Sequence, residues 1–195
     1  MNDENDLRIE PLSDERWPDL QALFGRGGAG YGCWCMFFRR SSTEMAAAKA
    51  VENREALRAL ASGDPPPGLI AYHGADPVGW VGLGPRSHFE RLVRSRFLRP
   101  VDDLLAWSVV CFFVSRRSRG RGVARALLDG AVAYAREHGA PAVEGYAREP
   151  GERRLSADSA YTGTVSLFRG GGFREVARAE PPGGGPVRVT MRLEF

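Results

Sequence analysis

Residues 107–147 decide the fold of this chain; they read WSVVCFFVSRRSRGRGVARALLDGAVAYAREHGAPAVEGYA. The opening run, residues 107–114, is almost continuously apolar, which is typical of a strand buried on both faces. From Val123 onward apolar side chains recur at helical spacing, and Gly139 is a natural helix end. Residues 142–147 return as a second apolar strand. This order predicts a βαβ unit with two parallel strands.

The turn between the first strand and the helix, residues 115–122, reads SRRSRGRG. Gly120 and Gly122 let the backbone come close to a ligand at this turn. The first N–H groups of the following helix lack helical partners and carry the positive end of the dipole. Four arginines surround them, at positions 116, 117, 119 and 121. The turn therefore predicts an anion site, most naturally for a phosphate or pyrophosphate.

Two familiar phosphate-binding patterns do not match this turn. A Walker A loop needs Gly-Lys-Ser/Thr, which is absent, and a dinucleotide fingerprint needs a third glycine where Arg125 stands. The structural alternative is a tight turn beneath solvated arginines.

The pattern R-x-x-G-x-G-V-A at residues 117–124 resembles the Arg/Gln-x-x-Gly-x-Gly/Ala motif of the Gcn5-related N-acetyltransferases. Residues 165–173, VSLFRGGGF, are similar to that family's late helix, which commonly ends Leu-Tyr-x-x-x-Gly-Phe. The order of strands and helices along the chain also fits. The expected fold is α/β, with a mixed central sheet of about six to seven strands and flanking helices.

Further strands and helices are expected on both sides of the βαβ unit. We predict helices from Ser13 or Asp14 to Phe24, from Thr43 to Leu60, and at 162–169, and strands at 7–12, 69–72, 77–83, 173–178 and 187–193. The strands at 69–72 and 77–83 form an antiparallel hairpin in this prediction.

At this length, residues 1–195 are expected to form one N-acetyltransferase domain. The resemblance assigns residues 1–66 to a strand and two helices that form part of the acceptor wall. It assigns 107–147 to the acetyl-CoA-binding unit and 160–195 to a C-terminal helix and strands.

The resemblance implies acetyl transfer from acetyl-CoA, as co-substrate, to a primary amine of a small molecule by direct attack, without a metal. The pyrophosphate would rest on the N–H groups of the turn, and the pantetheine would pair with the end of the strand, where an N–H polarises the acetyl carbonyl. The implied cofactor-binding residues are Phe112, Phe113, Val114, Arg117, Arg119, Gly120, Arg121, Gly122, Val123, Ala124 and Phe168.

The catalytic acid and base depart from the family pattern. Many members carry a tyrosine in the late helix that protonates the leaving thiolate, but Phe168 stands here. Tyr161 is the candidate acid, with a packing role as the alternative. Glu144 is the candidate base if its side of the strand faces the cleft; the alternative is a surface or salt-bridged glutamate. Ser108 and Cys111 are weaker candidates, and a covalent acyl-Cys111 needs a thiolate-promoting neighbour.

The segment 33–39, CWCMFFR, is expected to form a wall of the acceptor pocket. Trp34, Phe37 and Phe38 would give aromatic surface, and Arg39 would select an acidic group on the substrate. The alternative is that these are core residues under a loop. A zinc site is disfavoured, because two cysteines at i and i+2 lack further ligands.

The composition of the chain limits the classes of partner that we expect. The net charge of +3 comes with interspersed acidic residues and no long basic block, which disfavours nucleic acid. The polar N-terminus and the short apolar runs disfavour a secretory signal or a membrane span. We therefore expect a cytoplasmic protein with reduced thiols, and a homodimer is one possible assembly. Competing functions are a non-catalytic acyl-CoA sensor and a protein N-terminal or lysine acetyltransferase.

Overall fold

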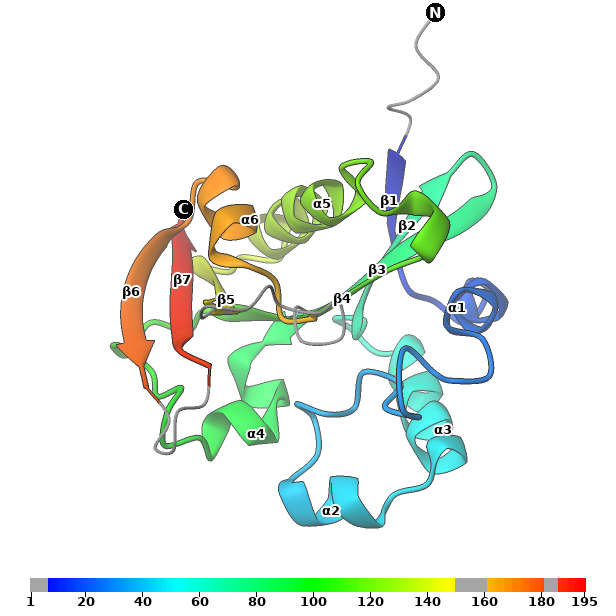
Figure 1. Cartoon of the computed structure of the whole chain (residues 1–195), viewed down its shortest axis with the longest axis horizontal. Coiled ribbons are helices and arrows are strands. Elements are labelled where there is room, and N and C mark those ends of the chain that lie inside the picture. The colour runs from blue at the N-terminus through cyan, green and yellow to red at the C-terminus, as the bar shows by residue number, and fades with distance from the viewer. Residues whose placement is uncertain (1–6, 150–160, 181–185) are drawn as a thin grey trace, which may run out of the picture.

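The computed structural model describes residues 7–149, 161–180 and 186–195. Within these residues seven strands form one mixed sheet in the order β1-β2-β3-β4-β5-β7-β6, antiparallel except between β4 and β5. This confirms the predicted fold class (Figure 1). The strands are β1 (Leu7–Pro11), β2 (Gly68–His73), β3 (Asp76–Pro85), β4 (Trp107–Val114), β5 (Ala142–Arg148), β6 (Arg174–Ala179) and β7 (Arg188–Glu194).

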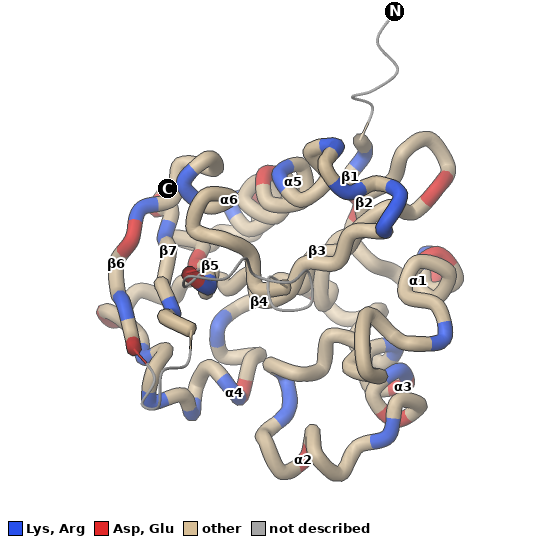
Figure 2. The backbone as a smooth tube through the Cα atoms, viewed as in Figure 1, with Lys and Arg blue, Asp and Glu red and all other residues tan. Residues whose placement is uncertain are grey.

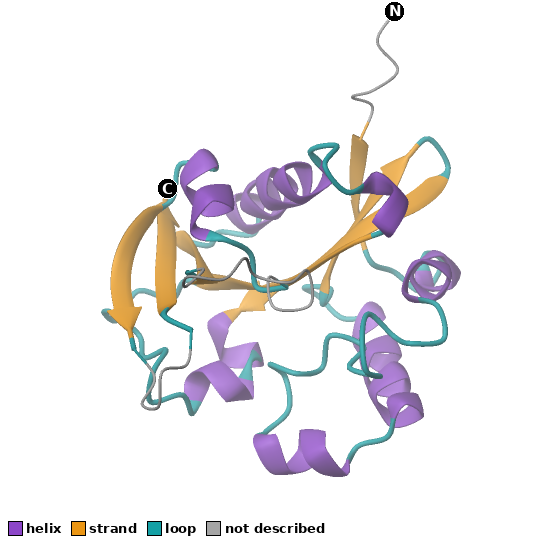
Figure 3. Cartoon of the chain, in the orientation of Figure 1, coloured by secondary structure: helices purple, strands orange, loops and turns teal. Residues whose placement is uncertain are grey.

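Helices cover both faces of the sheet (Figure 3). Helices α5 (Val123–Glu137) and α6 (Val165–Gly170) lie on one face, and the opposite face carries α1 (Trp17–Phe24), α2 (Ser42–Ala47), α3 (Ala50–Ala61) and α4 (Glu90–Val93). Short 3-10 turns, η2 (Arg86–His88) and η3 (Arg116–Ser118), follow β3 and β4. None of the helices in the described ranges is long and apolar enough to cross a membrane.

The prediction of one helix from Thr43 to Leu60 is wrong, because the chain is extended at Ala48 and two helices form. Ser41 caps α2: its Oγ accepts from the Glu44 N–H (3.2 Å) and the Glu44 carboxylate accepts from the Ser41 N–H (2.8 Å). The late helix also begins later than expected, at Val165. Thr164 is instead the N-cap of α6 and forms a parallel bridge with Arg148 of β5.

A hydrophobic core lies on each face of the sheet. On the α5 face, Leu127, Ala131 and Ala135 are fully buried against the strands. On the opposite face, Trp80 of β3 is fully buried among side chains of α1 and α3, including Leu20. Burial of one leucine side chain contributes roughly 1.5–3 kcal/mol, so these two layers hold the sheet between the helices.

Strands β4 and β5 pair over only part of their length. The parallel register runs from Trp107↔Val143 to Val109↔Gly145. Beyond these residues the two strands separate toward their carboxyl ends, where ligands bind in open α/β sheets.

A β-bulge lies on β4 at the point where the two strands separate. Gly82 pairs with Cys111 while Leu83 pairs with Val109, so Val110 is the extra residue. A bulge bends a strand and increases its twist, and such bulges are frequent beside active sites. The bend accounts for the separation of β4 from β5.

Candidate active site

The turn between β4 and α5 has the backbone that its sequence predicts. Gly120 and Gly122 both have φ +76°, in the left-handed region that favours glycine, and Gly122 is the N-cap of α5. A Cβ at either position would meet no heavy atom within 4 Å. The glycines are therefore required by conformation, and the space above them is open to a ligand.

A groove of about 890 Å³ lies beside this turn. Its lining includes four predicted cofactor residues, Arg117, Gly120, Arg121 and Val123. The rest comes from the turn itself, from the strand ends of β1 to β3 and from α1: Leu7, Ala22, Leu23, His73, Asp76, Pro77, Val78, Ser115 and Ser118. Figure 2 shows the basic turn between β4 and α5 at the edge of the molecule.

The residues of the turn fit a diphosphate. Arg117 and Arg121 face the groove, and the free N–H groups at the start of α5 lie beside Gly122. The Arg119 side chain instead reaches back to β4, where its Nε donates to the Val114 carbonyl oxygen at 3.3 Å. The arginines of the turn and the N-terminus of the 15-residue helix α5 together favour binding of a polyanion.

Residues 161–164, just before α6, bridge the gap where β4 and β5 separate. The Phe112 N–H donates to the Tyr161 carbonyl oxygen (2.6 Å), and the Arg148 N–H donates to that of Gly163 (3.4 Å). Arg148 also forms a parallel bridge with Thr164. A backbone carbonyl of this chain therefore already accepts from the Phe112 N–H, and the predicted pairing of pantetheine with the end of β4 stays a prediction.

Phe168 is a core residue, so its prediction as a cofactor-binding residue is wrong. It is fully buried, with ring centroids 6.1 Å from Phe112 and 5.2 Å from Phe173. A Cβ on Gly145 would lie 2.1 Å from its Cζ, and one on Gly163 would lie 2.7 Å from its ring. The Phe168 ring therefore fills the space that a side chain at Gly145 or Gly163 would need.

Phe113 also packs in the core, on the face opposite Phe168. Its ring lies 5.3 Å from that of Phe24 in α1, and it contacts the cluster around Trp80. Of the predicted residues on β4, Val114 lies at the end of the strand and is partly buried. The Phe113 side chain therefore packs toward α1, and the predicted role of this residue at the cofactor stays a prediction.

Tyr161 lies where the gap between β4 and β5 meets two predicted acceptor residues. Its ring centroid is 6.1 Å from that of Phe37 and 6.4 Å from that of Phe38. The Arg148 guanidinium lies 5.3 Å from the same ring. Burial raises the pKa of the Tyr161 hydroxyl, an effect that Arg148 and Arg188 partly offset. The hydroxyl is therefore protonated at neutral pH and able to donate.

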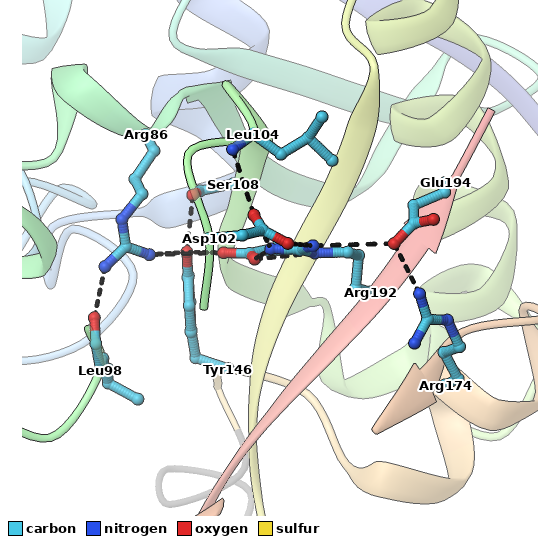
Figure 4. Close-up of polar contacts among 10 residues, drawn as sticks. Arg86, Leu98, Asp102, Leu104, Ser108, Tyr146, Arg174, Arg192 and Glu194 are labelled. Atoms are coloured by element: carbon cyan, nitrogen blue, oxygen red, sulfur yellow. Dashed lines mark hydrogen bonds and ion pairs between the residues drawn. The ribbon is translucent and has the colours of Figure 1, made fainter. Parts of the chain in front are cut away.

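Glu144 is enclosed by an ion-pair network on the α4 side of the sheet. Figure 4 shows other members of this network, among them Arg86, Tyr146 and Arg192. Its Oε1 accepts from Arg192 Nη2 (2.7 Å) and Nε (3.1 Å). Its Oε2 accepts from the Tyr146 hydroxyl (3.1 Å) and lies 3.4 Å from Arg86 Nη1. The prediction of Glu144 as the base is therefore corrected, because both oxygens are engaged and only 2% of the residue is exposed. The salt-bridged alternative is the one observed.

The network extends beyond Glu144 in two directions. Arg192 also donates to Asp102 at 2.5 and 3.0 Å, and this interaction lowers the pKa of the Asp102 carboxyl. Ser108 shares a 2.8 Å hydrogen bond with Tyr146, and burial raises the pKa of that tyrosine. Ser108 is fully buried and belongs to this structural network, which excludes it as an exposed base.

Two predicted acceptor residues, Trp34 and Arg39, are structural, as the core alternative requires. Trp34 is 5% exposed and stacks on Trp17 at 5.9 Å. Arg39 Nη2 donates to the carbonyl oxygens of Pro67 (3.1 Å) and Leu83 (3.2 Å). Burial lowers the pKa of Arg39 to about 10. The Arg39 guanidinium therefore fastens a loop to β3, and its predicted contact with an acidic substrate group is wrong.

The thiols lie together beneath β4. Cys35 Sγ is 3.3 Å from Cys111 Sγ and accepts from Trp80 Nε1 at 3.1 Å. Burial raises the pKa of Cys33 to about 11. Cys35, the thiol beside Cys111, is itself a weak acid in apolar surroundings. Cys35 therefore does not supply the thiolate-promoting group that a covalent acyl-Cys111 would need.

Comparison with known proteins agrees with this geometry. Residues 34–154 match the model of the Acetyltransferase (GNAT) family. The chain therefore belongs to the GNAT family, whose members are acetyl-CoA-dependent N-acetyltransferases. None of the curated sequences compared with the chain matches it.

Solved structures of acetyltransferases share the fold. A ribosomal-protein-alanine N-acetyltransferase from Brucella melitensis is 16% identical, with a TM-score of 0.57 over 96% of this chain and 99% of that one. A mosquito arylalkylamine N-acetyltransferase-like protein is 13% identical, with a TM-score of 0.59 over 97% and 100%. A Drosophila melanogaster polyamine N-acetyltransferase is 14% identical, with a TM-score of 0.55 over 97% and 100%. At these identities the likeness shows a common fold.

Proposed function

We propose that this protein, acting as a single domain, transfers the acetyl group of acetyl-CoA to a primary amine of a small molecule. In the balanced reaction the amine nitrogen bonds to the acetyl carbon, the carbon–sulfur bond breaks, the amine loses a proton and the sulfur gains one. The observation that carries the proposal is the combination of the glycine-arginine turn with the separation of β4 and β5. Both lie at the carboxyl end of β4.

The turn supplies the binding residues in this proposal. Arg117 and Arg121 hold the diphosphate together with the N–H groups that begin α5, next to Gly122. Val114, at the end of β4, orients the chain that leads from the diphosphate toward the gap. The Phe112 N–H holds Tyr161 in place through the Tyr161 carbonyl oxygen.

Tyr161 is the proposed proton donor to the departing sulfur. Its hydroxyl has a raised pKa, and its carbonyl is fixed to β4 in the gap. Phe37, which is partly buried, forms the aromatic side of the acceptor site against it, and Phe38, only 5% exposed, packs behind as a core residue. Glu144 keeps β5 and β7 together, and the amine proton leaves to solvent.

An acetyl-CoA turnover screen tests the proposal. Free thiol release is followed over amines, amino acids, aminoglycosides and peptides, and calorimetry with acetyl-CoA measures binding. We expect amine-dependent thiol release with at least one small acceptor. Binding without turnover on any acceptor would favour a sensor, and turnover confined to peptides would favour a protein acetyltransferase. Absence of binding at large excess of acetyl-CoA would contradict all three functions.

A further inference from the structure

Two arginines face each other across β5 and β7, beside Tyr161. Arg148 and Arg188 are directly paired in the antiparallel register. Both influence the pKa of the Tyr161 hydroxyl, and the Arg148 guanidinium lies 5.3 Å from its ring. Each of the two arginines is partly buried. A positive pair is thus fixed by the sheet next to the proposed proton donor.

The pair lies on the acceptor side of the sheet. Ala147 and Val189, which adjoin the two arginines, point into the core under α5. Side chains alternate along a strand, so Arg148 shares the other face with Tyr146, which packs with Phe38. The turn that is proposed to bind the diphosphate leads into α5, which lies on the face of Ala147 and Val189. The sheet therefore separates Arg148 and Arg188 from that turn.

No carboxylate of the described residues compensates these two charges. Like charges directly opposite on paired strands are destabilising, and burial together with the charge of Arg148 lowers the pKa of Arg188. Arg148 Nε is buried and has no hydrogen-bond partner. Among the described residues neither guanidinium forms an ion pair, and the nearby Glu149 binds Arg178.

The same two strands also contain an arginine whose charge is compensated by a carboxylate. Four residues along β5 and β7, Glu144 stands directly opposite Arg192, whose Nε and Nη2 both donate to Glu144 Oε1. At Arg148 and Arg188 the described part of the ladder pairs two cationic side chains and places no carboxylate opposite either one. An external anion with two oxygens in a plane would complete the pair, because a guanidinium fork matches a carboxylate.

We propose that Arg148 and Arg188 bind a carboxylate on the acceptor, so that the acceptor is a small amino carboxylate. The assignment rests on the proposed function, because it places the carboxylate beside Tyr161 in the acceptor site. It replaces the acid-selecting role predicted for Arg39, whose guanidinium is bound to two backbone carbonyls. The Arg148 guanidinium lies 5.3 Å from the centre of the Tyr161 ring, so a carboxylate bound by Arg148 would lie close to the proposed proton donor.

The test compares L-phenylalanine with phenethylamine and L-leucine with isoamylamine, pairs that differ by the carboxylate. It uses the wild type, Arg148→Gln, Arg188→Gln and the control Arg174→Gln, an exposed arginine of β6 that pairs with Glu194. A charged hydrogen bond is worth about 1.5–3 kcal/mol, so each site variant should raise KM for the amino acids roughly 10-fold to 150-fold. KM for acetyl-CoA should stay within about twofold.

Thermal shift supplies a readout that does not depend on turnover. The amino acids should raise Tm of the wild type and of Arg174→Gln, and should not do so for Arg148→Gln or Arg188→Gln. Without ligand, these two variants should keep or slightly raise Tm, because each removes a like-charge repulsion.

The outcomes separate this inference from the proposed function. Equal turnover of the amines and the amino acids by the wild type would overturn the carboxylate assignment and leave the acetyltransferase intact. A rise in KM for acetyl-CoA in both site variants would overturn it also, by assigning the pair to a coenzyme phosphate. Absence of turnover on any acceptor together with no Tm shift by amino acids would overturn both.

Discussion

Glu144→Gln tests whether the buried carboxylate holds the sheet together or accepts the amine proton. Glutamine keeps the size and one acceptor oxygen but removes the charge that faces Arg192 and Arg86. Glu144 and Arg192 are each 2–3% exposed, so water cannot replace the lost charge. We expect a stability defect and nearly normal chemistry.

The magnitude follows from burial and from the partners that remain. Removing one partner of a buried pair costs about 3–5 kcal/mol. Arg192 keeps Asp102 as a partner, so the loss should lie near the low end, about 3 kcal/mol. In a chain of this size 1 kcal/mol shifts Tm by about 2–4 °C, which predicts a fall in Tm of roughly 6–12 °C.

Calorimetry or circular dichroism measures Tm of the wild type and of Glu144→Gln, and kcat is measured well below both melting temperatures. Glu149→Gln is the matched control, because its carboxylate forms an exposed ion pair with Arg178 and should matter far less. We expect kcat of Glu144→Gln to fall less than about threefold, whereas loss of a general base costs about 10²–10⁴. An unchanged Tm with a kcat loss in that larger range would refute the structural role.

Three further predictions follow from the turn, the tyrosine and the network. Tyr161→Phe should lower kcat by about 10²–10⁴ and leave acetyl-CoA binding unchanged by calorimetry; a loss below about threefold would make the residue a packing group and solvent the proton source. Gly122→Val should abolish acetyl-CoA binding, whereas Gly139→Val, with φ +72° and equally open space at the other end of α5, should lower only Tm; equal binding losses would show that the anion site lies elsewhere. Arg192 lowers the pKa of the Asp102 carboxyl, so this pair stabilises the fold fully above the unfolded pKa, about 3.9, and the contribution is lost as pH falls through the lower folded pKa. Acid titration of Tm should therefore show a smaller decline in Asp102→Asn than in the wild type, and parallel curves would contradict the assignment.

The amino-acid sequence was sufficient for the features that depend on neighbouring residues. The β4 strand, the α5 helix and the hairpin of β2 and β3 fall within a few residues of their predicted bounds. Each is specified by a short-range period of apolar side chains and by glycine stops. The glycines at 120 and 122 likewise have the positive φ that their turn requires.

The prediction from local patterns was wrong where a helix is interrupted by a short signal that is weak in the sequence. The helix expected from Thr43 to Leu60 is interrupted at Ala48, a residue with high helix propensity, because Glu52 accepts from the Lys49 N–H and starts a new helix. Only the competing caps reveal this interruption.

The roles of the polar side chains were decided by the tertiary structure. A buried charge needs a partner, and sequence does not say which residue lies opposite on a strand almost fifty positions away. The register of β5 and β7 places Arg192 against Glu144, which makes a predicted base structural. It also places Arg188 against Arg148, and neither of these arginines has an ion-pair partner among the described residues. Local spacing and periodicity thus predicted the strands, the helix and the glycine turn of the βαβ unit, because these depend on contiguous residues. The pairing of strands distant in sequence decided which charged groups remain available to a substrate.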